Sequence, residues 1–264
     1  MTATSQPAYD AFSSEYDRFV NWDNRLAFEL PFLERQLTAL GGPRGLRVLD
    51  AACGTGMHAL ALARLGCLSA GADLSQGMVE RARANAASAG LDVSFLQAGF
   101  GALSAAFAPH SFNALLCLGN SLPHLLSPGE VAATLRDFAA CLRPGGLLVL
   151  QNRNFDAVMA KRERWMDPQG YTAEGVERIF LRFYDYLPGD LIDFNIVTLR
   201  RAEDGSWRQQ VSTTRLAPLL RDPLIQALER TGFSQITAYG GLNGSPFDAQ
   251  NSGNLVITAT TAPA

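Results

Sequence analysis

The sequence has few cysteines, few histidines and no long apolar run, and each shortage excludes a class of protein. The three histidines are scattered, and the four cysteines form no C-x-x-C pair and match no zinc-ligand spacing. We therefore expect buried free thiols and no metal site. No apolar run reaches the roughly 20 residues that a membrane helix needs. The first residues, MTATSQPAYD, carry no basic-then-apolar signal, so we expect a cytoplasmic protein.

Charge is also scarce. Charged residues make up 18% of the chain and the formal net charge is −3. No strong field attracts nucleic acid or an anionic membrane surface, so we expect neither as a partner. Apolar residues make up 47% of the 264 residues, enough for one large α/β domain or a domain with a small appendage. The expected partner is a small-molecule substrate, and formation of a homo-oligomer stays open.

Strand-like and helix-like segments alternate through the middle of the chain. The expected strands are Leu46–Asp50, Leu68–Asp73, Val93–Gln97, Phe112–Leu118, Leu147–Gln151, Ile236–Tyr239 and Asn254–Thr260. The expected helices between and after them are Gly56–Leu65, Gln76–Ala89, Gly129–Leu142 and Pro223–Thr231. This alternation predicts an α/β fold with a Rossmann-like, doubly wound, seven-stranded and mostly parallel sheet.

Two segments depart from this alternation. Residues 1–44 are predicted to be helical, with periodic apolar positions over Ala8–Val20 and Asn24–Leu40, and we expect them to cover the site. Residues 176–217 predict a small antiparallel insert with strands Arg178–Tyr186, Leu191–Arg200 and Arg208–Leu216. The insert is expected on the substrate side or at a dimer interface. Residues 45–175 and 218–264 then form the cofactor-binding domain.

A glycine turn follows the first strand of this domain, where residues 48–56 read VLDAACGTG. A strand, a glycine turn and a helix together direct backbone N–H groups at a ligand. A nucleoside triphosphate site would need a lysine in the motif G-x-x-x-x-G-K-[ST], and Met57 and His58 follow Gly56 instead. A dinucleotide fits the run GTGMHA at residues 54–59 better, with Asp73 at the expected distance, so this alternative stays open.

Asp50 favours a third ligand, S-adenosylmethionine. Its carboxylate, at the end of the strand, would repel a pyrophosphate and would suit the ammonium group of a methionine moiety, directly or through water. Asp73 closes the second strand and would accept hydrogen bonds from ribose hydroxyls. The alternative is that both aspartates only cap helices.

The same residues carry a resemblance to a known family. Residues 48–56, with Asp73-Leu74-Ser75 and the turn LRPGG at residues 142–146, resemble motifs of the class I S-adenosylmethionine-dependent methyltransferases. The resemblance covers most of residues 45–150. It implies a methyltransferase (EC 2.1.1.-) that uses S-adenosylmethionine and releases S-adenosylhomocysteine. It implies that the cofactor-binding residues include Asp50, Ala51, Gly54, Gly56, Asp73, Leu74, Met78, Gly99, Phe100 and Leu118.

Three further stretches are similar to the glycine and sarcosine N-methyltransferase branch. They read CLGNSLPHL at 117–125, RNFD at 153–156 and WDNR at 22–25. The resemblance implies that Arg25 holds the cofactor's carboxylate and that Asn120 and Arg153 bind a substrate carboxylate. It also places Ser121 and His124 near the cofactor, Phe100 against the adenine, and Tyr16 as a candidate hydroxyl over the reaction centre.

The spacing of these residues agrees with a shared site. Asn120 and Arg153 follow the fourth and fifth strands, and ligands of open α/β sheets bind beyond the carboxyl ends of the strands. An arginine can bind a carboxylate through two parallel hydrogen bonds. Three alternatives remain: Arg153 as a surface ion-pair partner, Asn120 as a turn residue and His124 as a packing residue. Tyr184, Tyr186 and Tyr239 are further candidates to orient an amine, or packing tyrosines.

Three positions depart from the family pattern and leave the acceptor undetermined: Gly99, Gln151 and Phe155. The expected function is methyl transfer to the nitrogen of a small amino acid or amine of the glycine or sarcosine type. The alternatives are an oxygen or carbon acceptor, a nicotinamide-dependent oxidoreductase, and a cofactor-binding subunit without activity.

Overall fold

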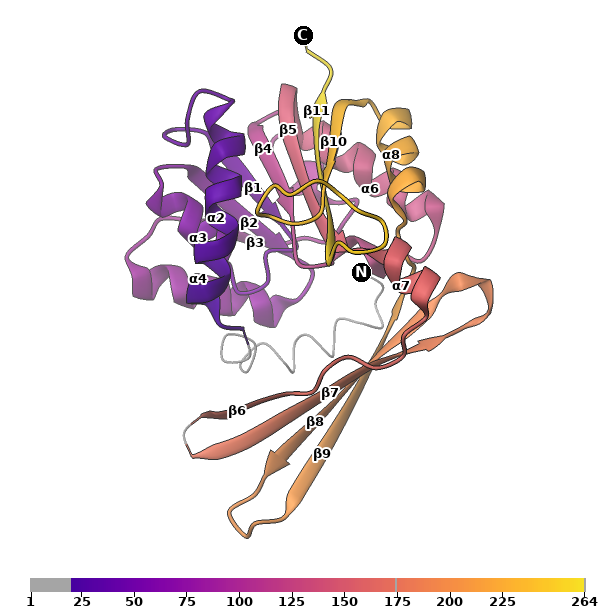
Figure 1. The fold of residues 1–264 in the computed structure, drawn as a ribbon. Helices are drawn as coiled ribbons and strands as arrows, with labels where there is room; N and C mark the ends of the chain where they lie inside the picture. The colour runs from indigo at the N-terminus through magenta and orange to yellow at the C-terminus, as the bar shows by residue number, and fades with distance from the viewer. Residues whose placement is uncertain (1–19, 174, 264) are drawn as a thin grey trace.

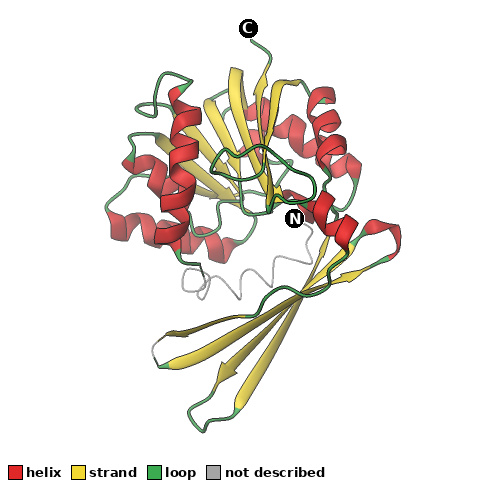
Figure 2. Ribbon diagram, viewed as in Figure 1, coloured by secondary structure: helices red, strands yellow, loops and turns green. Residues whose placement is uncertain are grey.

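Two β-sheets make up the framework of the computed structural model, which describes residues 20–173 and 175–263 (Figures 1 and 2). The larger sheet has seven strands in the order β10-β11-β5-β4-β1-β2-β3. Strands β1 to β5 pair in parallel, whereas β11 pairs antiparallel with both β5 and β10. This is the Rossmann-like, mostly parallel sheet that was predicted. The strands are β1 (Arg47–Ala51), β2 (Leu68–Asp73), β3 (Ser94–Gln97), β4 (Phe112–Cys117), β5 (Leu142–Arg153), β10 (Phe233–Tyr239) and β11 (Asn254–Thr261).

Helices cover both faces of the larger sheet. Helices α2, α3 and α4 pack on one face, and α5, α6 and α8 on the other (Figure 1). Side chains alternate between these faces along each strand, so Val48 and Leu49 of β1 belong to different apolar clusters. The helices are α2 (Trp22–Thr38), α3 (Met57–Arg64), α4 (Gln76–Ala89), α5 (Leu103–Ala106), α6 (Pro128–Cys141), α7 (Phe155–Lys161) and α8 (Arg221–Arg230).

Local signals explain where the helices beside the site begin and end. The Ser75 hydroxyl accepts a 3.1 Å hydrogen bond from the Met78 N–H and caps α4, which ends at Gly90 in a left-handed conformation (φ 64°). The Asn21 side chain caps α2 in the same way by accepting the Asn24 N–H at 3.1 Å. Helix α2 continues through Pro31.

The order of the strands places a crevice at the centre of the sheet. The chain runs from β1 to β2 and β3 on one side, then crosses to β4 on the other side of β1. Asp50 therefore lies on the central strand, in register with Gly71 of β2 and Leu116 of β4. Ligands of doubly wound sheets bind at such a reversal of strand order, beyond the carboxyl ends of the strands.

The second sheet is the antiparallel insert, which projects away from the larger sheet (Figure 1). It contains β6 (Gln169–Ala173), β7 (Val176–Tyr186), β8 (Ile192–Arg201) and β9 (Trp207–Leu216), in that order. It joins the main domain through α7 and through an apolar cluster of Phe155, Tyr184, Ile192 and Leu216. The Ala217 N–H also donates to the Pro123 carbonyl at 2.8 Å, which ties the end of β9 to the short 3-10 helix η1 (Leu122–His124).

Some elements differ from the expectations. The insert has four strands where three were predicted, β5 begins at Leu142 instead of Leu147, and α5 and α7 were not predicted. The helix expected over Ala8–Val20 lies outside the described residues, apart from Val20. The division of the chain into a covering segment, a cofactor domain and an insert with a role in substrate binding or dimerisation stays a prediction.

The cysteines are free and buried, as predicted. Burial raises the pKa of each of these thiols, which keeps them protonated and unreactive. None of the described helices is both long and apolar enough to cross a membrane.

Candidate active site at the carboxyl edge of the sheet

The loop after β1 bends sharply because three of its residues have positive φ angles: Ala52 (58°), Gly54 (54°) and Gly56 (80°). Gly56 has an additional constraint. A Cβ atom added there would lie 2.6 Å from Phe95 Cζ, so the missing side chain makes room for an aromatic ring of the core. Ala51, just before the bend, is fully buried in the sheet.

Asp73, at the end of β2, holds this loop in place. Its Oδ2 atom accepts a 2.9 Å hydrogen bond from the Gly54 N–H, and its Oδ1 atom accepts one of the same length from the Ser75 N–H. The side chain is almost completely buried. A carboxylate has about four acceptor positions, so Asp73 can also accept hydrogen bonds from a ligand hydroxyl.

Asp50, near the end of β1, is buried and has acceptor capacity left over. Only 2% of its surface is exposed, and its Oδ2 atom has no hydrogen-bond partner among the described residues. Burial raises the pKa of Asp50 to about 6, while the nearby His58 opposes this rise and Asp73 adds to it. A buried carboxylate of this kind is stabilised by a cation.

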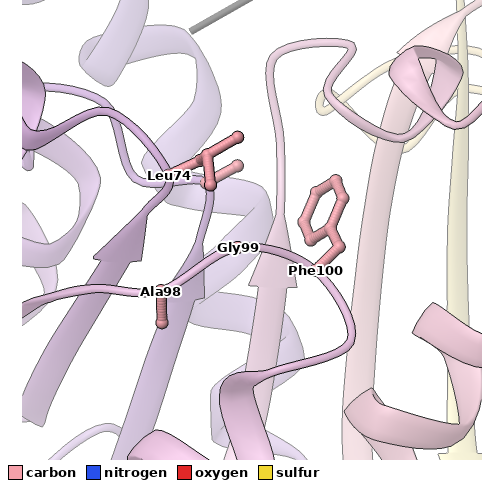
Figure 3. Close-up of a pocket in the computed structure, with 5 residues that line it drawn as sticks. Leu74, Ala98, Gly99 and Phe100 are labelled. Atoms are coloured by element: carbon pink, nitrogen blue, oxygen red, sulfur yellow. The ribbon is translucent and has the colours of Figure 1, made fainter. Parts of the chain in front are cut away.

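A shallow apolar hollow lies beside these two acids. It is lined by residues that follow β1, β2 and β3: Ala52, Leu74, Ala98, Gly99 and Phe100. Figure 3 shows the Leu74 and Phe100 side chains on either side of Gly99. A Cβ atom on Gly99 would lie 3.0 Å from Leu74 Cδ1, so the glycine keeps the hollow open. Phe100 is itself held by an edge-to-face contact with Phe138 of α6, with ring centroids 5.6 Å apart.

Arg25 comes to this edge from α2. Its Nε atom donates to both carboxylate oxygens of Glu29, at 3.1 and 3.2 Å. A Cβ atom added to Gly119 would lie 3.8 Å from Arg25 Nη2, so the guanidinium lies close to the loop after β4.

The loops after β4 and β5 are bonded to each other. The Asn120 Oδ1 atom accepts a 2.9 Å hydrogen bond from the Arg153 N–H, and Asn120 itself has a φ of 67°. Gln151 accepts the Gly119 N–H on its Oε1 atom at 2.6 Å and donates from Nε2 to Asn254 Oδ1 at 3.1 Å. The structure therefore explains the unusual glutamine at 151, because it bridges β4, β5 and β11.

Arg153 is exposed, and its charge acts on two residues of β7 in the insert. Burial raises the pKa of Tyr184, and the positive charge of Arg153 opposes this rise. Arg182 lies two residues before Tyr184, on the same face of β7, and its Nε atom has no hydrogen-bond partner within residues 20–173 and 175–263. Burial lowers the pKa of Arg182, and the Arg153 charge lowers it further. Two neighbouring guanidinium groups that repel each other favour the binding of an anion.

The sequence gives no sign of Arg182 as a site residue, because it belongs to no motif. The available signal is that Arg182 lies two residues before Tyr184, which places both side chains on the same face of β7. That pattern alone does not show which face of the strand lies against the site.

The remaining candidates lie in three places. Leu118, Ser121 and His124 lie in the connection after β4, where the Ser121 hydroxyl donates to the Leu118 carbonyl at 3.0 Å. Burial lowers the pKa of His124 to about 4, so its ring is neutral at pH 7. Met78 is buried in the first turn of α4. Tyr16 lies outside the described residues.

Two of the other tyrosines have structural contacts. Tyr239 packs edge-to-face on Phe32, with ring centroids 5.2 Å apart. The Tyr186 hydroxyl donates to the Glu163 carbonyl at 3.0 Å.

The donor set fits S-adenosylmethionine. The hollow is shallow and mostly apolar, which suits an adenine ring, and Asp73 has acceptor capacity for ribose hydroxyls. Asp50 has an open, buried carboxylate oxygen for an ammonium group, and Arg25 lies near the same edge for a carboxylate.

Comparisons with known proteins agree. Residues 48–146 match the family of methyltransferase domains. A glycine/sarcosine N-methyltransferase of Halorhodospira halochloris is 29% identical over 240 residues, which cover 91% of this chain and 84% of that protein.

Solved structures share the fold. An S-adenosylmethionine-dependent methyltransferase from Clostridium acetobutylicum aligns over 97% of this chain and 99% of its own, with a TM-score of 0.77 at 15% identity. The amino pentose methyltransferase CalS10 of Micromonospora echinaspora, bound to S-adenosylmethionine, aligns over 96% of this chain and 97% of its own, with a TM-score of 0.73 at 21% identity. The chain belongs to the class I S-adenosylmethionine-dependent methyltransferases, and S-adenosylmethionine is its methyl donor.

Proposed function

We propose that this enzyme methylates the nitrogen of a small amino acid or amine of the glycine or sarcosine type. The observation that carries the proposal is the hydrogen bond between Asn120 Oδ1 and the Arg153 N–H, which joins the two stretches expected to bind the acceptor. The similarity to the H. halochloris glycine/sarcosine N-methyltransferase supports the same acceptor class.

In this proposal four groups of residues hold the cofactor. Asp50 binds the ammonium group of the methionine end and Arg25 binds its carboxylate. Asp73 accepts hydrogen bonds from the ribose hydroxyls, and the hollow around Gly99 takes the adenine, with Leu74 and Phe100 on its sides. The bound sulfonium supplies an electrophilic methyl group and a good leaving group.

The acceptor's carboxylate binds between Arg153 and Arg182. The positive charge of Arg153 lowers the pKa of Arg182 on β7, and an anion between the two guanidinium groups would relieve their repulsion. The Asn120 oxygen is already used by the Arg153 N–H, so this side chain contributes through its amide nitrogen, which can donate to a carboxylate. Tyr16 stays a candidate for orienting the amine.

The chemistry requires positioning more than a strong base. An amine must be neutral to act as a nucleophile, and its proton can leave to water before the attack. His124, with its pKa lowered to about 4, is too weak a base to hold a proton taken from an ammonium group at neutral pH. The protein's main contribution is therefore to hold the amine in line with the methyl group and to exclude water.

The organisation of the chain is part of the proposal. The position of Arg25 beside the loop after β4 supports a covering role for residues 1–44. The position of Arg182 and Tyr184 opposite Arg153 supports a substrate-side role for the insert. A homo-oligomer and a cytoplasmic location also stay predictions.

The decisive experiment is a methyl-acceptor panel read by mass spectrometry. The purified enzyme and S-adenosylmethionine are incubated with glycine, sarcosine, dimethylglycine, small amines without a carboxylate and amino sugars. N-methylated glycine or sarcosine supports the proposal. Turnover of an oxygen or carbon acceptor alone would overturn it. Turnover limited to amines without a carboxylate would contradict the proposal that Arg153 and Arg182 bind the acceptor's carboxylate.

A further inference from the structure

Arg25, the residue proposed to bind the cofactor's carboxylate, lies on a helix at the edge of the domain. The position of its guanidinium group therefore depends on the side chains that hold it. Arg25 lies one turn into α2, which packs beside α3 on the same face of the sheet (Figure 1). An arginine side chain has many rotamers, and ordering it costs conformational entropy. A site that binds well therefore needs this side chain to be ordered before the ligand arrives.

Glu29 supplies that order from within the same helix. It lies four residues after Arg25, and its carboxylate accepts the Arg25 Nε–H on both oxygens. The Glu29 Oε2 atom is also 2.6 Å from His58 Nε2, in the first turn of α3. One buried carboxylate thus connects the arginine of α2 to His58, the second residue after the glycine turn.

Trp22 completes the arrangement on the other side. Its ring lies edge-on to the His58 ring, with centroids 5.5 Å apart. The Arg25 guanidinium carbon lies 5.0 Å from the centroid of the Trp22 ring, within the range of a cation–π contact. Arg25 is therefore held by Glu29 and by Trp22, and both of these side chains contact His58.

Burying charged groups costs free energy, so a cluster with only a structural role is not expected to contain them. Glu29 is only 7% exposed and His58 only 5% exposed. Burial raises the pKa of Glu29, but the contacts with His58 and Arg25 outweigh it and the net shift is downward, so the carboxylate is charged at neutral pH. Well-packed apolar residues often stabilise a protein as well as a buried ionic group does, so stability alone does not account for such a group.

We propose that Glu29 and His58 are positioning residues that hold Arg25 in place for the carboxylate of S-adenosylmethionine. Neither acts on the ligand directly, and both act through the guanidinium. Asp50 projects from β1 to the same face of the sheet, the one covered by α2 and α3. The cation and the anion that meet the two charged ends of the methionine moiety therefore lie on the same face of the sheet. This inference concerns the methyl donor and is independent of the acceptor's identity.

The test compares two ligands that differ only in the amino-acid end. S-Adenosylhomocysteine carries that end, and 5′-methylthioadenosine has the same adenosine and thioether without it. Calorimetric titration should show that Glu29→Gln and His58→Phe each weaken S-adenosylhomocysteine binding about tenfold, the scale of one charge-assisted hydrogen bond. Binding of 5′-methylthioadenosine should change less than twofold. His58→Gln, which keeps a donor near the Nε2 position, should recover most of the loss.

A double substitution separates positioning from general loosening. In an Arg25→Ala background, Glu29→Gln and His58→Phe should cause no further loss of S-adenosylhomocysteine affinity. Asp193→Asn serves as the control, because it removes an exposed ion pair with Arg215 (2.8 Å) in the insert and should leave both affinities unchanged.

Equal weakening of both ligands, or a loss that adds to that of Arg25→Ala, would overturn the proposal. If Glu29→Gln does not fold, the two His58 variants decide the same question. Because the assay contains no acceptor, its outcome is separate from that of the acceptor panel.

Discussion

The Gly54 N–H donates a 2.9 Å hydrogen bond to Asp73 Oδ2, so the glycine turn after β1 is fixed by the acid at the end of β2. The second oxygen of the same carboxylate accepts the Ser75 N–H, at the N-terminus of α4. Asp73 therefore shapes the site even before a ligand is bound. Because Asp73 is also proposed to bind the ribose, its substitution should affect both stability and affinity, and the two effects need to be separated.

We expect Asp73→Ala to reduce S-adenosylhomocysteine affinity by at least tenfold and to lower the free energy of unfolding by about 2–3 kcal/mol, because two backbone donors lose their acceptor. Calorimetry measures the affinity, and urea unfolding measures the free energy of unfolding.

Asp137 offers a matched control, since its buried carboxylate also accepts two backbone N–H groups, from Leu103 and Ser104, at 2.9 Å each. Asp137→Ala should lose similar stability with affinity changed less than about threefold. Undiminished ligand affinity in Asp73→Ala would contradict the ribose-binding role.

Asp50→Asn should make the ligand-free protein more stable at pH 7 and should impair cofactor binding. The folded-state pKa of about 6 lies above the ordinary value of 3.8, so the folded state holds a proton that the unfolded state has released between these values. The contribution of Asp50 to wild-type stability therefore falls as pH rises from 4 to 6, by up to roughly 3 kcal/mol.

The asparagine variant should lack this decline, because it has no proton to lose. Urea unfolding at pH 4, 5, 6 and 7, without ligand, gives the comparison. If the free energy of unfolding changes with pH in the same way in the wild type and in Asp50→Asn, the decline does not come from the Asp50 carboxyl.

Arg182→Met should raise the KM for an acceptor with a carboxylate by about tenfold, because one of two guanidinium groups facing the anion is lost. The KM for an acceptor amine without a carboxylate should be unchanged, and steady-state kinetics with both acceptors measures the contrast. Arg164→Gln is the control: Arg164 is half-exposed, pairs with Asp185 at 2.7 Å on the insert and should affect neither KM. A similar rise in KM for both acceptors would indicate that Arg182 only supports the fold.

Gly56→Ala should destabilise the fold by about 3 kcal/mol or more, because a left-handed backbone and a steric clash act together. Gly90→Ala tests the first factor alone: Gly90 has a φ of 64°, and nothing lies within 4 Å of an added Cβ. That variant should lose only about 1 kcal/mol. Phe95→Leu should recover part of the loss in the Gly56→Ala background, since the ring that the new Cβ meets becomes smaller. Chemical unfolding of the three variants measures these losses, and equal losses at Gly56 and Gly90 would exclude the clash.

The sequence by itself determined the larger sheet and the carboxyl ends of its strands. Apolar runs such as Leu68–Asp73 and Phe112–Leu118 coincide with β2 and β4 within one residue, because strands buried on both faces need continuous apolar side chains. The acids Asp50 and Asp73 were also located correctly at strand ends, since a charge at the end of an apolar run marks where the strand leaves the core. These features are local, and local patterns can be read along one chain.

The sequence did not predict the short elements, or those that form only through contacts with another element. Helices α5 and α7 have four and seven residues, too short to show a helical period. Strand β6 reads QGYTA, which has little apolar alternation, and it is a strand because β7 pairs with it. The long β5 likewise begins before Leu147, because Leu142 pairs with Phe112 of β4 and the Gly145 N–H donates to the Ala262 carbonyl just after β11.

Only the tertiary structure decided which side chains meet. Glu29 and His58 are 29 residues apart, on two helices, and no motif relates them. Arg153 and Arg182 come from different sheets, and Gln151 and Asn254 from strands far apart in the chain. Periodicity shows which face of an element is buried but not which residue of another element lies opposite it. That choice depends on how the helices and sheets pack in three dimensions, because packing brings distant parts of the chain within hydrogen-bonding distance.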